Sequence, residues 1–445
     1  MVYAVSIAVL VVAFALATVR PINLGLLAFA GAFAIGSGLS GISLEEIQGF
    51  FPGDMFLTVL GITLLFGVAR ANGTVDLLLE RSLRLVGGRP WAVAWMMFLL
   101  AAALMSLGAV LAIGMLAPIA MPLAKRFGIK PLLMSAMLGH GAFGAAFSPV
   151  TVYSVSIQQL LDEQGYSISA LTLFIVPFGL NLLLAVTAFV TMGRHLLRRQ
   201  PTRTAAQTVA EAKARTPATV GAAARTASSG GADSAPETGP DPATGPSRVT
   251  AGQWTTLAAI GSLLGAALLG VDVGVAATFL SVALLLAFPA LTRESVGAIG
   301  WPAILMVCGV MTYMEVMTAN GTIEYLGEKA LDLPSMLLTA LVLLLAVGMI
   351  SAVGSSFGII LISLQLAAPL MASGELPVTA LVLALCFCAT TVDVSPFSSN
   401  GVLVLGSAIV PDRQRFQRRM LAYTGYVVAA AALLSWGLLV LPSAA

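Results

Sequence analysis

The sequence predicts an all-α polytopic membrane protein, with about ten transmembrane helices and two re-entrant hairpins arranged as two inverted repeats. Three observations predict this fold. Of the 445 residues, 58% are hydrophobic and 9% are charged, whereas soluble domains carry about 25% charged residues. Basic residues are confined to a few loops, and short motifs recur in the same order in the two halves of the chain.

Composition also limits the classes of function. The net charge is +2 and no basic stripe with interleaved aromatic residues occurs, so we expect no nucleic-acid partner. The three cysteines (Cys308, Cys386 and Cys388) lie in apolar stretches, and we interpret them as inert thiols rather than metal ligands. We expect no cofactor. The composition instead predicts that the protein is embedded in a lipid membrane.

One segment differs in composition from the rest of the chain. Residues 200–250 are rich in Ala, Thr, Gly, Ser and Pro and contain almost no large apolar side chains. Such a segment cannot bury enough apolar surface to fold, so we predict a disordered linker. It divides the chain into a first repeat, 1–199, and a second repeat, 251–445.

Apolar segments long enough to cross a bilayer, about 20 residues each, occur in both repeats. In the first repeat they are 2–19, 21–40, 55–71, 131–158 and 170–193. In the second repeat they are 253–270, 273–291, 302–319, 377–410 and 420–441.

The basic residues predict the orientation, because basic loops remain in the cytoplasm. In the first repeat they fall in four places: Arg20; Arg70, Arg81, Arg84 and Arg89; Lys125, Arg126 and Lys130; and Arg194, Arg198 and Arg199. One topology puts all four inside, with Arg293 and the cluster from Arg413 to Arg419. We therefore expect a multi-pass protein of the bacterial inner membrane, with both termini outside and the linker in the cytoplasm.

Two further apolar stretches, 90–124 and 335–371, are each centred on small residues. In the first, each leg around Ser106-Leu107-Gly108 has about 15 residues, or about 22 Å of helix, which is short for a full crossing. We predict a re-entrant hairpin from the cytoplasm here, and one from outside around 351–356. Exposed backbone at such a tip is tolerated where it lines a cavity.

Three sequence matches link the two repeats. Their positions in the second repeat follow those in the first by 245 to 248 residues. The pairs are Ala71-Asn72-Gly73-Thr74 with Ala319-Asn320-Gly321-Thr322, Met105-Ser106 with Ile350-Ser351, and Ser148-Pro149 with Ser395-Pro396. A constant offset predicts inverted repeats, which are typical of transporters.

Two of the predicted spans contain breaks at matching positions, Phe147–Thr151 and Thr390–Gly401. Proline interrupts the helical hydrogen bonds, and a broken helix exposes groups that bind ions. A plain proline kink is the alternative at each break. Asp393 is the clearest single candidate for a functional residue, because burying a carboxylate inside the membrane costs free energy and such residues are usually functional. It either binds a cation or proton, or caps the broken helix.

Other titratable residues carry weaker signals. His140 is interpreted as a packing residue, with proton transfer as the alternative. Asp54 and Glu315 lie near span ends and are expected to be solvated. No Arg or Lys lies in mid-span, so a dianionic substrate would need co-bound cations, which favours cation coupling.

This order of features, a hairpin with a Ser-containing tip followed by a helix broken at a small-polar Pro motif, resembles the ion transporter superfamily, which includes the divalent anion–sodium symporters. The string Ala389–Gly401 carries much of the resemblance. The first repeat, with Leu116-Ala117-Pro118-Ile119-Ala120-Met121-Pro122, looks like dicarboxylate carriers of the MatC type. The hairpin tips here lack the Asn and Thr that the sodium symporters have.

The resemblance implies an elevator mechanism in a homodimer, with sodium and a small dicarboxylate such as malonate as ligands. Implied substrate-binding residues are Ser106, Gly108, Ser148, Thr151, Ser351, Ser355, Ser356, Ser398, Ser399 and Asn400. Implied sodium ligands are Ser106, Ser148, Pro149, Thr151, Gly354, Asp393 and Ser395.

We therefore expect a sodium-coupled secondary importer of a small dicarboxylate, and not an enzyme. Two alternatives within transport are a proton-coupled carrier and the membrane subunit of a binding-protein-dependent transporter. An intramembrane enzyme is disfavoured because the sequence has no HExxH or GxSxG motif, and ATP-driven transport because it has no P-loop.

Overall fold

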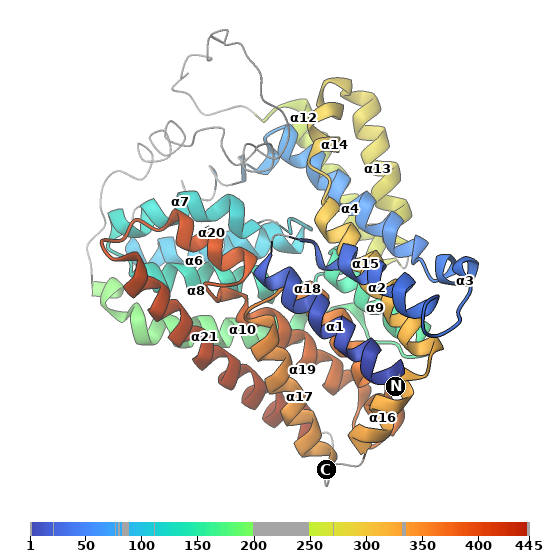
Figure 1. Cartoon of the computed structure of the whole chain (residues 1–445). Helices are drawn as coiled ribbons and strands as arrows, with labels where there is room; N and C mark the ends of the chain where they lie inside the picture. Colours follow the sequence, from blue (N-terminus) through green and yellow to red (C-terminus); the bar gives the residue numbers. More distant parts are fainter. Residues whose placement is uncertain are drawn as a thin grey trace, which may run out of the picture.

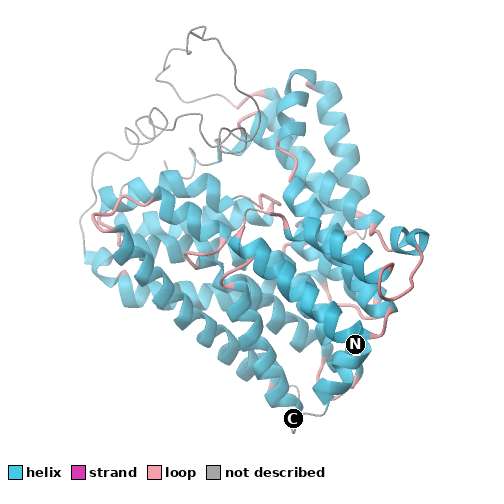
Figure 2. Cartoon of the chain, in the orientation of Figure 1, coloured by secondary structure: helices cyan, strands magenta, loops and turns pink. Residues whose placement is uncertain are grey.

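The computed structural model of the chain describes residues 2–20, 22–75, 77–78, 81, 89–110, 112–198, 249–269, 271–331 and 335–442. Within these ranges the protein consists of helices and loops, with no strand (Figure 2). The predicted linker lies outside the described residues except for Val249 and Thr250, as do Arg84 and Arg199.

The helices before and after the linker follow one another in the same order. Before it they are α1 (Val2–Val19), α2 (Leu24–Gly36), α3 (Leu44–Gly49), α4 (Gly53–Ala71), α6 (Pro90–Ser106), α7 (Ala112–Phe127), α8 (Pro131–Gly144), α9 (Val152–Glu163), α10 (Ala170–Met192) and η1 (Arg194–Arg198). After it they are α12 (Ala251–Leu268), α13 (Val273–Ala287), η3 (Pro289–Leu291), α14 (Thr292–Gly297), α15 (Trp301–Ala319), α16 (Thr322–Leu331), α17 (Met336–Ser351), α18 (Ser356–Ala372), α19 (Val378–Thr391), η4 (Val392–Val394), α20 (Ser399–Ser407), α21 (Arg413–Ser435) and η5 (Trp436–Val440).

Several helices differ in length from the predicted spans. Within the described residues, four helical segments are long and apolar enough to cross a membrane, one of which joins α3 and α4 across a short turn. A fifth span is possible if α13 and the η3–α14 segment, bent by 113°, form one. Six other apolar helices have 10–17 residues. The expected spans 131–158 and 377–410 are each divided, because proline and small polar residues interrupt them. The last span begins earlier than predicted, since Asp412 caps α21 at Arg413.

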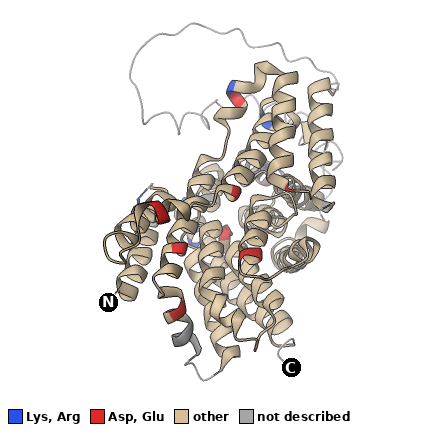
Figure 3. Cartoon of the chain, turned by 90° about the vertical axis from the view of Figure 1, so that its right-hand side faces the viewer, with Lys and Arg blue, Asp and Glu red and all other residues tan. Residues whose placement is uncertain are grey.

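Charged residues are sparse along the helices (Figure 3). This matches the 9% charged composition of the chain and the long buried runs of apolar side chains. The predicted fold class, a polytopic α-helical membrane protein, is confirmed by this architecture together with the structural comparison reported below.

Two close helix crossings connect the halves, and both use paired glycines. A Cβ on Gly25 of α2 would overlap the backbone of α15 at Leu305, and a Cβ on Gly309 of α15 would overlap the backbone of Gly25. The crossing of α4 with α13 repeats this arrangement, since Gly61 approaches the backbone at Gly274. Small residues let membrane helices approach closely and gain van der Waals contact.

The recurrent Asn-Gly-Thr motifs form the same turn after α4 and α15. Gly73 and Gly321 have φ of +73° and +75°, a region that favours glycine. In both motifs the Asn side chain accepts a hydrogen bond from the backbone N–H of the Thr two residues later, at 3.0 Å for Asn72 and 3.1 Å for Asn320.

Each Asn also reaches the first helix of the other half. The amide of Asn72 donates to Thr256 Oγ1 at 2.6 Å on α12. The amide of Asn320 donates to Ser6 Oγ at 3.2 Å on α1. The motifs thus join helices that are far apart in the sequence.

We expect Asn320→Ala to destabilise the protein, because it removes the hydrogen bonds of the amide to Ser6 and Ser40. Loss of a buried partner costs about 1–3 kcal/mol. The midpoint of thermal unfolding in detergent measures this effect. Thr255→Ala is the control, since Thr255 is exposed and bonds only within its own helix. An equal midpoint for the two variants would contradict the role of the motif.

The helices pack in two groups (Figure 1). In one group α1, α2, α4, α12, α13 and α15 pack around the two glycine crossings. In the other, the hairpin helices α6, α7, α17 and α18 pack with the broken helices α8 and α19 and with α10 and α21. The groups meet where α15 contacts α18, and where α9, which packs on α10 and α18, contacts α4. The helix α16 also joins them, because it contacts α1 and α15 of the first group and α18 of the second. This interface lies next to the two helix breaks.

Candidate functional site

Both predicted helix breaks are present. The helix α8 ends at Gly144 and α9 begins at Val152, and α19 ends at Thr391 before the short η4 and α20. Pro149 and Pro396 lie in these interruptions and supply no backbone N–H. The helix that leads into the first break packs against the second break, because a Cβ on Gly139 of α8 would overlap the Val394 side chain of η4.

Thr151 and Ser398 perform the same task in the two breaks. Each hydroxyl donates to the carbonyl oxygens three and five residues earlier, which for Thr151 are those of Ser148 and Ala146 and for Ser398 those of Ser395 and Asp393. Each also caps the helix that follows, by accepting a backbone N–H. Both hydroxyl groups thus form their hydrogen bonds with backbone groups of the break and of the helix that follows.

The matching position to Asp393 in the first break is Ala146, so only the second break carries a carboxylate. Asp393 is 4% exposed. Its Oδ2 accepts hydrogen bonds from Ser356 Oγ at 2.9 Å and from Asn400 Nδ2 at 3.2 Å. Three elements therefore meet at this oxygen: η4, the start of α18 at the second hairpin tip, and α20.

The other carboxylate oxygen of Asp393 is buried and has no hydrogen-bond partner among the described residues, and the same holds for Oγ1 of Thr391. A buried polar atom without a partner costs about 1–3 kcal/mol, and more if it is charged. Carboxylate, hydroxyl and carbonyl oxygens are the ligands of hard cations. These oxygen atoms therefore suit a small bound cation, or a proton on Asp393.

Tyr153 is a site residue that the sequence analysis missed. It lies at the start of α9, is 5% exposed, and its phenol interacts with Ser356 and lies near the charge of Asp393. Its ring packs on Phe357 of α18 with centroids 4.6 Å apart. Its position in the first repeat matches that of Asn400 in the second, which is the signal that would have found it.

The second hairpin tip is tied to the second break. Ser351 Oγ donates to the carbonyl of Ala389 at 2.5 Å, near the end of α19. Ser355 Oγ contacts Met306 Sδ at 3.3 Å instead of the break, and a Cβ on Gly354 would overlap Phe14 of α1. The tip thus contacts both helix groups.

The first hairpin tip has fewer polar links. Ser106 Oγ donates to Ala103 O at 3.0 Å within its own helix. Gly108 has φ of +100°, and a Cβ there would lie 3.1 Å from Ile62 and 3.2 Å from Phe66 of α4. No hydrogen bond joins Ser106 to the first break among the described residues.

The remaining predicted residues lie in the breaks. Ser148 and Ser395 are 4% and 1% exposed, and Ser395 Oγ accepts from Phe397 N at 3.2 Å. Ser399 begins α20, and its side chain lies outside what the structure describes. The structure therefore brings Ser356, Asp393, Asn400 and Tyr153 together, and leaves Ser106 and Ser355 apart from this cluster.

His140 is fully buried between the halves. Its Nε2 lies 2.7 Å from the Tyr423 hydroxyl of α21, and its Nδ1 lies 3.1 Å from Asn181 Oδ1 of α10. Both ring nitrogens thus have partners, as the packing interpretation expects.

Four acidic residues outside the breaks, Asp54, Asp162, Glu163 and Glu315, lie near one another. Burial raises the pKa of Glu163 at the end of α9, and the charges of Glu315, Asp54 and Asp162 raise it further. Asp54 is exposed and Glu315 is half-buried. The prediction of a solvated position therefore holds for Asp54 and only in part for Glu315.

Comparison with known proteins agrees with this architecture. Residues 1–146 match the family model for the Dicarboxylate carrier protein MatC N-terminus, so the resemblance predicted for the first repeat is confirmed over that range. No curated protein matches the chain. The crystal structure of the Alcanivorax borkumensis YdaH transporter, described as having an unusual topology, is similar with a TM-score of 0.51 at 15% identity, covering 88% of this chain and 86% of that chain. Both similarities are to transporters and not to enzymes, and the chain is a multi-pass α-helical membrane protein.

Proposed function

We propose that the protein is a secondary active importer of a small dicarboxylate such as malonate, coupled to sodium. The match of residues 1–146 to MatC-type dicarboxylate carriers supports the substrate class. The similarity to the YdaH structure supports the fold. The observation that carries the coupling is the buried Asp393 carboxylate. One of its oxygens has no hydrogen-bond partner among the described residues, and the other accepts from Ser356 at the second hairpin tip.

The arrangement gives each oxygen of Asp393 a separate task. Ser356 and Asn400 hold Oδ2 in position, while Oδ1 and Thr391 Oγ1 are available to a cation. A bound sodium ion would offset the carboxylate charge and add positive charge near the breaks. A dianion then needs no buried Arg, which agrees with the absence of Lys and Arg from the cluster.

The two helix groups suggest how the site moves. The hairpins and breaks form one group and the glycine crossings hold the other, so an elevator displacement of the first group past the second is the proposed motion. Inverted repeats 1–199 and 251–445, linked through the cytoplasm, provide the two access states. A homodimer would anchor the group that contains α4 and α13.

The test is uptake of labelled malonate by the purified chain in proteoliposomes, with and without an inward sodium gradient. We expect uptake that depends on sodium. Uptake that is independent of sodium and lost when the proton gradient collapses would instead support a proton-coupled carrier, which the buried Asp393 also fits. Absence of uptake for every small dicarboxylate, unless a soluble binding protein is added, would contradict the proposal.

We expect Tyr153→Phe to lower malonate uptake about tenfold, which corresponds to about 1.4 kcal/mol, because it removes the hydroxyl beside Ser356 and Asp393. The ring and its packing on Phe357 remain. Initial rates at several sodium concentrations measure the effect. Tyr166→Phe is the matched control, since Tyr166 lies in the loop after α9. Equal rates in both variants would remove Tyr153 from the site.

A further inference from the structure

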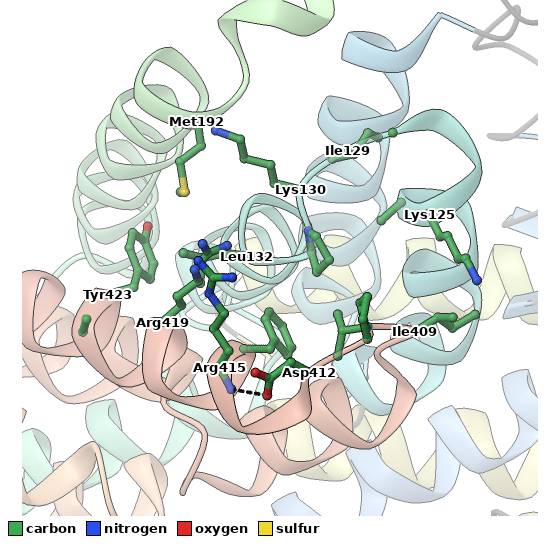
Figure 4. A pocket seen from close by; sticks show the side chains of 17 residues that line it. Lys125, Ile129, Lys130, Leu132, Met192, Ile409, Asp412, Arg415, Arg419 and Tyr423 are labelled. Atoms are coloured by element: carbon green, nitrogen blue, oxygen red, sulfur yellow. Dashed lines mark hydrogen bonds between the residues drawn. The ribbon is translucent and has the colours of Figure 1, made fainter.

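A pocket of about 960 Å³ lies where the α7–α8 loop faces the start of α21 (Figure 4). Its charged lining residues are Lys125, Lys130, Arg415, Arg419 and Asp412. Asp412 is the acidic residue among them, and its Oδ1 already accepts from the backbone N–H of Arg415 at 2.8 Å. Four positive charges therefore face one negative charge, in a place that the Asp393 cluster does not reach.

Three of the four basic residues lie near two helix N-termini, where positive charge is unfavourable, whereas Lys125 lies in the last turn of α7. Lys130 immediately precedes α8 and makes no side-chain cap, and Arg415 and Arg419 lie in the first two turns of α21. The helix dipole repels cations at these ends. Arg415 and Arg419 are also four residues apart on one helix face, where like charges repel, and Figure 4 shows their side chains next to each other.

An anion in the pocket would relieve both effects, because helix N-termini and basic side chains together favour negative charge. Cytoplasmic loops are generally basic, which explains the sign of these residues. It does not explain why residues from separate halves of the chain converge on one hollow.

The rest of the lining is mainly apolar and includes Leu132, Met192 and Ile409 (Figure 4). Beyond the pocket, apolar side chains continue on the outer faces of α10 and α21, where Val190 is 45% and Leu421 is 48% exposed. A fully hydrated anion makes no favourable contact with this apolar surface. An amphiphile with an anionic head group can pair with the basic residues of the pocket and also pack its apolar chains along the helices.

We propose that this pocket binds the phosphate head group of an acidic phospholipid, with the acyl chains along α10 and α21. Basic pockets between membrane helices bind such head groups. The lining residues come from both halves of the chain, as Lys130 and Arg415 do, so the lipid contacts both. Tyr423 of the lining also forms a hydrogen bond with His140 of α8. The lipid thereby stabilises the association of the two halves next to the helix breaks. This site is separate from the proposed transport function.

The test uses the full-length chain purified in detergent and titrated with phosphatidylglycerol or phosphatidylcholine. Thermal unfolding and native mass spectrometry report binding, since a ligand of the folded state raises its stability by mass action. Phosphatidylglycerol is expected to stabilise the protein more. The double variant Arg415→Gln/Arg419→Gln is expected to bind it roughly 25-fold more weakly, because each basic residue contributes about fivefold.

The matched control is Arg413→Gln/Arg418→Gln, which removes the same charge from the same helix outside the pocket lining and is expected to keep the affinity. Lys125→Gln/Lys130→Gln tests the facing wall independently if the first variant does not fold. Equal weakening in the control would show general surface attraction and overturn the proposal. Equal stabilisation by inorganic phosphate or glycerol phosphate would assign the site to a soluble anion. Displacement of the lipid by malonate would assign it to the substrate.

Discussion

Asp393→Asn is expected to lower sodium-driven malonate uptake by at least about 100-fold, equivalent to about 2.7 kcal/mol. The substitution keeps the size of the side chain and removes its charge. The donors Ser356 and Asn400 then lose a carboxylate acceptor, and the free oxygen no longer carries charge for a cation. Initial uptake rates in proteoliposomes at matched protein density measure the loss.

The same variant separates the two coupling ions. Asparagine resembles a protonated aspartic acid, so a proton-coupled carrier would keep exchange of malonate across the membrane while losing net uptake. A sodium-coupled carrier would lose both at ordinary sodium concentrations. Asp54→Asn is the control, because Asp54 is exposed at the start of α4. Equal activity of the two variants would contradict the assignment of Asp393.

The sequence predicted the elements that hydropathy and charge control directly. The hairpin tips at Ser106 and Ser351, the two breaks, and Asp393 were all predicted from apolar runs interrupted by small polar residues and proline. These local signals suffice because the bilayer requires each backbone group to be satisfied within its own segment.

Contacts between the halves were harder to predict. Tyr153 looks like any core aromatic until the fold brings it to Asp393. Arg415 and Lys130 were interpreted only as orientation signals, and their shared pocket depends on how α21 packs beside α8. The glycines at the two crossings are also spaced by nearly the repeat offset, but among 44 glycines such a spacing is not a distinct signal.

Gly309→Ala is expected to destabilise the protein by about 1–3 kcal/mol or more, as overpacking of a close contact does. The new Cβ would overlap backbone atoms of Gly25 on α2, and backbone cannot move aside as a flexible side chain can. We expect Gly61→Ala to have a similar effect, because its Cβ would lie 2.6 Å from Thr278 Oγ1 and 2.8 Å from the Gly274 carbonyl at the matching crossing. Thermal unfolding in detergent, followed by the loss of monodisperse protein, measures both.

Gly265→Ala on α12 is the matched control, because a Cβ there meets no atom within 4 Å. In an open helical position alanine is more favourable than glycine by about 0.5–1 kcal/mol, so this variant is expected to be as stable as the parent or more stable. Substitution of glycine by alanine is thus expected to lower the stability of the protein at position 309 and to keep or raise it at position 265. If Gly309→Ala unfolded at the temperature of Gly265→Ala, the α2–α15 crossing would not be a close backbone contact, and the static group proposed for the elevator would lose its anchor.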